Sequence, residues 1–132
     1  MRIAKLILTP LWLLFAYFQI NDTNQYGNHD PWFWILFYLF AASLTAASLK
    51  FTLPPWLLPA TIGFCLGAAL FRMQNDSGSF DFTAPFRATA IPSQMTKATQ
   101  QPNEIGGLLL VATWLLILHL NTIKQKNTNP AP

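Results

Sequence analysis

The chain has 132 residues, of which 52% are apolar and only 10% are charged. A soluble domain usually carries about 25% charged residues, so this composition excludes an ordinary soluble protein and indicates a protein whose main partner is the lipid bilayer. The net charge is +3, but the eight basic residues are spread along the chain, and we therefore expect no binding to nucleic acid.

Four apolar runs alternate with polar segments along the chain, and they lie at residues 3–20, 32–49, 56–72 and 105–123. Each run is close to the length that a helix needs to cross the hydrocarbon core of a bilayer. None of them shows the two-residue alternation of a strand. The sequence therefore predicts an all-α membrane protein, a four-helix transmembrane bundle that forms a single domain over residues 1–123.

The first run follows Arg2 and Lys5, as in a signal peptide, but no small-residue cleavage site follows it. We interpret it as a transmembrane helix, which is physically the same as an uncleaved signal anchor. The positive-inside rule favours a cytoplasmic N-terminus and C-terminus, because five basic residues then lie inside and three outside. This N-in/C-in topology places loops 21–31 and 74–104 on the outer face. It fits a bacterial inner membrane as well as several other membranes.

Polar residues gather at the outer interface in this topology, and the candidate cluster consists of Asn21, Asp22, Asp30 and Glu104. One interpretation is solvated loop charge, with Asp30 and Asn103 as helix caps. The other is a shared polar site. Such a site could be an ion-pair cluster with Arg72 that ties helix ends together, or a site for a hard cation or small polar ligand.

No catalytic or metal-binding motif can be recognised by its spacing, so we expect no enzymatic activity, no cofactor and no metal site. Small residues suggest close helix contacts instead. Ala60, Gly63 and Gly67 lie one helical turn apart in the third run, and Gly107 lies near the start of the fourth. The two interpretations are a dimer interface and packing within the bundle, and a multi-span protein favours the second.

Two segments resemble the transmembrane protein 220 family. Gln19-x-Asn21-Asp22, followed by Asp30-Pro31-x-x-Trp34 and Tyr38, resembles the family pattern Q-x-N-D-x-D-P-x-x-W between its first two spans. Glu104 with Gly107-Leu108 resembles the acidic residue and Gly-Leu pair that open its last span. The chain departs from the pattern at the seven-residue stretch Thr23–His29 and at Asn103, where the family often has Arg. The resemblance implies a small four-span membrane protein and supplies no activity.

Two functions follow as expectations. The first is a structural or accessory component that packs with other membrane proteins, in a larger membrane protein complex or a homo-oligomer. The second is a binding or transport protein that uses the outer acidic cluster. No charged residue lies in the middle of a span, which argues against an ion pathway through the membrane. Residues 124–132 are predicted to form a polar, disordered tail.

Overall fold

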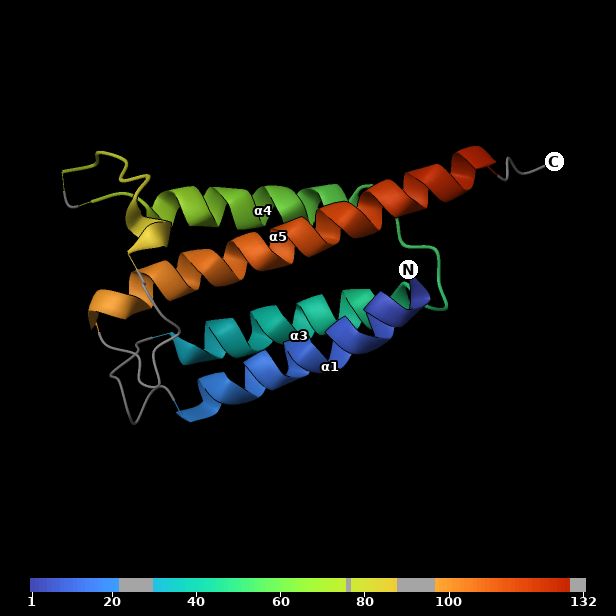
Figure 1. Ribbon diagram of the computed structural model, residues 1–132, viewed down its shortest axis with the longest axis horizontal. Helices are drawn as coiled ribbons and strands as arrows, with labels where there is room; N and C mark the ends of the chain where they lie inside the picture. Colours follow the sequence, from blue (N-terminus) through green and yellow to red (C-terminus); the bar gives the residue numbers. More distant parts are fainter. Residues whose placement is uncertain (22–29, 76, 88–96, 129–132) are drawn as a thin grey trace. The chain divides into compact units, whose positions relative to one another are not determined.

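The structure is a computed structural model, and it describes residues 1–21, 30–75, 77–87 and 97–128. The chain divides into two compact units, Met1–Leu53 and Pro54–Pro132. Each unit is built around one pair of helices (Figure 1). The described residues form four α-helices and no strand beyond one isolated pairing of Gln74 with Phe80. The predicted all-α class is therefore confirmed for this part of the chain.

The first unit is an antiparallel hairpin of α1 (Arg2–Phe18) and α3 (Pro31–Ala47), with a short 3₁₀ helix, η1 (Gln19–Asn21), after α1. Near the middle, the ring of Trp12 stacks on that of Tyr38, with the centroids 6.3 Å apart. Near one end, the Lys5 ammonium donates a hydrogen bond of 2.8 Å to the Ser48 carbonyl. This bond places a positive charge at the C-terminal end of α3, where the helix dipole is negative.

The start of α3 follows from two neighbouring residues. Pro31 occupies the first turn, where its missing N–H has no helical partner to lose. Asp30 occupies the N-cap position as predicted, but its side chain makes no capping hydrogen bond. Its backbone carbonyl accepts a hydrogen bond of 3.1 Å from the amide of Phe33. The helix therefore begins because of the proline and the backbone, without a side-chain cap.

The second unit pairs α4 (Leu57–Arg72) with α5 (Lys97–Thr128), which lie side by side and run in opposite directions (Figure 1). The buried residues of α4 recur every three or four positions, at Leu58, Thr61, Cys65 and Ala69. This spacing places them on one helical face. The matching buried residues of α5 include Ile105, Leu108, Leu115 and Leu118.

A compact turn follows α4. The Asn75 carboxamide oxygen accepts hydrogen bonds from the amides of Ser77 and Ser79, at 3.1 and 3.0 Å, and Gly78 adopts a φ of 79°. The Asp81 amide donates to the Met73 carbonyl at 2.8 Å and closes the turn. The local side chains therefore supply the hydrogen bonds that a regular helix or strand would otherwise provide.

A short 3₁₀ helix, η2 (Ala84–Phe86), comes next. The Asp81 carboxylate precedes it and accepts hydrogen bonds from the Thr83 amide and hydroxyl, at 3.0 and 2.6 Å. The same carboxylate forms an ion pair with Arg87 on the far side of η2. Asp81 therefore holds both ends of this segment, as an Asx turn does.

The bounds of α5 correct two predictions. The fourth helix was expected at 105–123, with 97–104 in a loop and 124–132 disordered, but the helix covers Lys97–Thr128. Its first residues are polar and include Pro102, so no apolar period marked them as helical. Contacts with the end of α4 hold them in the helix, and tertiary contacts often override local propensity. Asn103 therefore lies inside α5 and does not cap it.

The C-terminal extension has a simpler cause. Lys and Gln favour helix, and the Thr128 hydroxyl donates to the Lys124 carbonyl at 2.9 Å. Residues 129–132 lie outside the described residues. Among the described helices, only the stretch Gln100–Gln125 of α5 is long and apolar enough, by length and composition, to cross a membrane. Both α3 and α4 are apolar but shorter.

Acidification tests the role that Asp81 has in the loop. Hydrogen bonds from Thr83, together with the Arg87 guanidinium, hold the pKa of the Asp81 carboxyl below its usual range. A lowered pKa in the folded state means that this stabilisation is complete above the unfolded pKa of about 3.9 and is lost as the pH falls through the lowered value. We expect the Thr83 amide NMR shift to titrate with a midpoint below about 3.9. A midpoint at or above that value would contradict this role.

Candidate functional site

The candidate site lies at one end of the second unit, where α4 ends and the apolar part of α5 begins. Arg72 in the last turn of α4 forms an ion pair with Glu104 of α5. The Glu104 side chain is 6% exposed and that of Arg72 is 31% exposed. A carboxylate removed from water to this degree requires a partner of opposite charge. Arg72 is also favourably placed at the negative end of the α4 dipole.

Two glutamines complete the arrangement. The Gln100 carboxamide lies one turn before Glu104 on α5 and donates a hydrogen bond of 2.9 Å to its Oε1. The Gln101 carboxamide donates to the Arg72 backbone carbonyl at 2.5 Å. That carbonyl belongs to the last turn of α4, where carbonyls have no partner within their own helix. The four polar residues therefore join the end of α4 to the first turns of α5.

A hollow of about 450 Å³ opens beside this cluster. It is an open surface feature, and all the residues around it belong to the second unit: Phe71, Arg72, Gln74, Asn75, Gln100, Gln101 and Glu104. Its lining is mainly polar. The Glu104 carboxylate already accepts bonds from Arg72 at one oxygen and from Gln100 at the other. A cation at Glu104 would therefore compete with an ion pair that is already formed.

The predicted acidic cluster can be followed only in part. Glu104 lies in the site just described, and Asp30 precedes α3 in the first unit. Asn21 ends η1, and Asp22 lies outside the described residues. A shared site of all four residues would join the two units, and so it stays a prediction. Within the described residues, no group of three or more His, Cys, Asp or Glu side chains could hold a metal ion.

The small residues of α4 have a clear position. Ala60, Gly63 and Gly67, which we call the small-residue face, are exposed, and a Cβ atom added at either glycine would meet no atom within 4 Å. Helical geometry places them opposite the buried face of Thr61, Cys65 and Ala69. The contact of α4 with α5 therefore does not use the small-residue face. Gly107, in contrast, is buried on α5.

The contributions of Lys5, Gln100 and Gln101 could not be recognised from the sequence. Lys5 appeared only as a flanking charge, and both glutamines lay in a segment predicted as loop. The signal for the glutamines was present but weak. Gln100 and Glu104 are four residues apart, which is the spacing of neighbours on a helix surface, and it becomes informative only once α5 is known to begin at Lys97.

A double-mutant cycle tests the ion pair. Arg72→Met leaves the buried carboxylate without its cation, and we expect it to lower the free energy of unfolding by roughly 2–4 kcal/mol. Glu104→Gln should also destabilise the protein. The two changes together should cost less than their sum, with a coupling energy on the order of 1–3 kcal/mol. Unfolding in a mild detergent, followed by circular dichroism, measures all three variants.

Arg87→Met is the matched control, because it breaks the ion pair between Arg87 and Asp81. Each side chain of this pair is more exposed than its counterpart in the Arg72–Glu104 pair. An exposed pair is worth about 1 kcal/mol or less. Equal effects of Arg72→Met and Arg87→Met, or additive effects of the Arg72 and Glu104 variants, would contradict the structural role of the Arg72–Glu104 pair.

Comparison with known proteins places the chain in a family. The family described as Transmembrane family 220, helix, matches residues 11–120, which extend from within α1 to within the last third of α5. No curated protein and no solved structure matches the chain. The match confirms the resemblance drawn from the Gln19–Tyr38 and Glu104–Leu108 segments. The chain belongs to transmembrane family 220 and is a membrane protein.

Proposed function

We propose that this protein is a structural or accessory membrane component, which packs against another membrane protein through the small-residue face of α4. The observation that carries the proposal is that Gly63 and Gly67 are exposed and have open space where their Cβ atoms would lie. The family match supports the membrane setting. The partner is a transmembrane helix of another chain or of a second copy of this one.

Large apolar side chains on a lipid-facing helix make favourable contacts with lipid tails. The helix α4 has such side chains at Phe64, Leu66 and Leu70, which are exposed. Glycine brings no such benefit, and each one inside a helix costs roughly 0.5–1 kcal/mol relative to alanine. Small residues at this spacing do allow two backbones to approach closely, which favours helix association in a membrane. A partner helix at this face would offset that cost.

The proposal includes four spans in an N-in/C-in orientation. The shorter helices α1, α3 and α4 have 17, 17 and 16 residues, and at 1.5 Å per residue they extend about 24–26 Å. A hydrocarbon core of about 30 Å can adjust to such helices by local thinning, at a modest cost. The orientation rests on the distribution of Lys and Arg and stays a prediction, as does the placement in a bacterial inner membrane.

A paired substitution tests the proposed interface. Gly63→Leu combined with Gly67→Leu fills the small-residue face, which lies opposite the residues of α4 that pack on α5, and neither added Cβ atom would meet an atom within 4 Å. We expect the stability of the isolated protein to stay the same or to rise, because leucine favours a helix more than glycine does, while the amount of co-purified partner falls roughly tenfold, which corresponds to about 1.4 kcal/mol of lost association energy. Quantitative affinity purification at native expression measures the loss.

Thr113→Leu is the matched control, because Thr113 is exposed on α5 in the same unit and the change adds similar apolar bulk away from the small-residue face. The control should co-purify the partner at the level of the unsubstituted protein. If the glycine variant retains its partners as well as Thr113→Leu does, the small-residue face is not the interface. Two differently tagged copies of the chain separate self-association from binding to another protein.

The second candidate function is binding of a small polar ligand, and the open hollow beside Arg72 and Glu104 favours it. Carboxamide groups of Gln74, Asn75 and Gln101 line this hollow and can both donate and accept hydrogen bonds. The Arg72–Glu104 pair is already formed, so a ligand would bind beside the pair. The accessory role remains the first proposal, because small-molecule sites usually enclose most of their ligand, whereas this hollow is open.

A further inference from the structure

Three phenylalanines are exposed on the segment that follows α4. We call residues 73–75 and 77–87 the phenylalanine loop. Its Phe80, Phe82 and Phe86 side chains are 49%, 65% and 81% exposed, and the rings of Phe80 and Phe82 stack with their centroids 6.0 Å apart. Clustered exposed aromatic groups on such a short segment mark an interaction surface.

Hydrogen bonds fix the position of this loop along the axis of α5, relative to the apolar part of that helix. Gln101 donates to the Arg72 carbonyl, so α4 ends level with the polar residues of α5 that come just before its apolar run begins at Ile105. The loop continues from that point, and the Asp81 amide returns to the Met73 carbonyl. In a transmembrane protein this level is the boundary between the acyl chains and the headgroups.

The loop also satisfies its own polar groups. The Asp81 carboxylate is paired with Arg87 and bonded to Thr83, and Asn75 accepts bonds from Ser77 and Ser79. An unsatisfied polar group would make contact with acyl chains costly. The internal pairing removes much of that cost, so the phenylalanine side chains can enter the apolar boundary while the paired charges remain among the headgroups.

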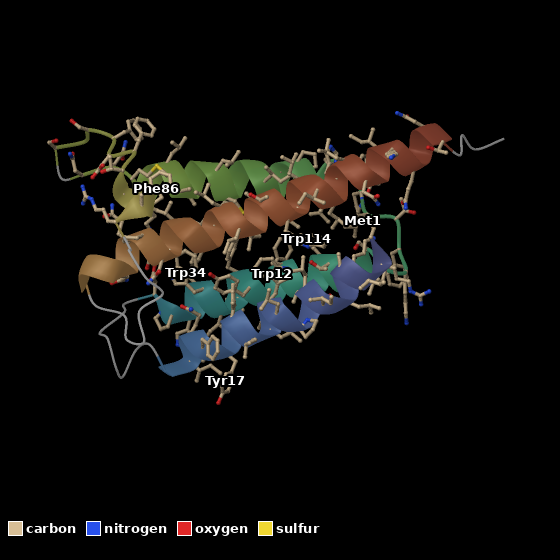
Figure 2. The ribbon with its side chains drawn as sticks, viewed as in Figure 1. Met1, Trp12, Tyr17, Trp34, Phe86 and Trp114 are labelled. Atoms are coloured by element: carbon tan, nitrogen blue, oxygen red, sulfur yellow. The ribbon has the colours of Figure 1, made fainter. Side chains whose placement is uncertain are left out.

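The scaffold holds the loop in place. η2 packs against α5, and the Ala84 side chain within it is fully buried. Phe86 belongs to the same short helix and is exposed, close to the C-terminal end of α4 (Figure 2). On the last turn of α4, Phe71 is also 71% exposed. Exposed phenylalanine side chains are therefore present both on the last turn of α4 and on the loop that follows it.

We propose that the phenylalanine loop is a membrane-interface anchor, with Phe80, Phe82 and Phe86 inserted at the headgroup–acyl boundary of the bilayer that α5 crosses. The partner is the lipid surface itself. The bilayer is favoured over a protein partner because the loop lies beside the start of the apolar run of α5 and the two charged side chains among its described residues, Asp81 and Arg87, pair with each other. The anchor fixes the depth of the second unit in the membrane.

Site-directed spin labelling of the full chain tests this anchor. Labels are introduced one at a time through Phe82→Cys, Phe86→Cys and Ser77→Cys in a Cys65→Ala background, and each protein is reconstituted alone into phosphatidylcholine vesicles. Collision with oxygen reports apolar surroundings, and collision with a water-soluble nickel complex reports water. We expect the ratio of oxygen to nickel collision to be several-fold higher at positions 82 and 86 than at 77.

Ser77 is the matched control because it lies on the same loop, is exposed and forms hydrogen bonds through its amide and hydroxyl to Asn75. A label at Leu110, which is exposed on α5, gives the reference value for a lipid contact. Nickel collision at positions 82 and 86 equal to that at 77 would overturn the anchor, because these positions would then be in water. Nickel collision at Leu110 as high as at 77 would overturn the membrane placement of α5 as well.

Discussion

The structure of the second unit depends on one constraint, which is that the Glu104 carboxylate is withdrawn from water and must be neutralised. Arg72 provides the charge from α4, and Gln100 provides a further hydrogen bond from α5. Because each partner belongs to a different helix, the ion pair fixes the register of α4 against α5. The level of the phenylalanine loop follows from that register, since the loop begins immediately after Arg72.

The ion pair also helps to determine which face of α4 packs on α5 and which face is left exposed. The face that contains Thr61, Cys65 and Ala69 packs on α5, and the end of the helix is occupied by the ion pair. The small-residue face lies opposite and has no partner among the described residues of its own unit. The Glu104 carboxylate is already paired with Arg72 and is therefore a poor site for a metal ion. For this reason we base the proposed function on the small-residue face.

The sequence predicted the helices well where apolar runs decide the structure. The bounds of α1, α3 and α4 lie within two residues of the predicted spans, because the apolar runs, with Pro31 at the start of α3, mark them in the sequence. It failed at both ends of α5, where polar side chains are held by contacts with α4 or by intrinsic helix propensity. The ion pair of Arg72 with Glu104 was one of several open interpretations, since partners 32 residues apart leave no local pattern.

Native mass spectrometry of the protein, extracted in mild detergent at native expression, tests the accessory role most directly. We predict an assembly larger than one chain, with a defined stoichiometry, because a partner helix at the small-residue face would offset the cost of its exposed glycines. A single chain that carries a small additional mass would contradict it. That result would make the hollow beside Arg72 and Glu104 the functional site and the protein a binding protein.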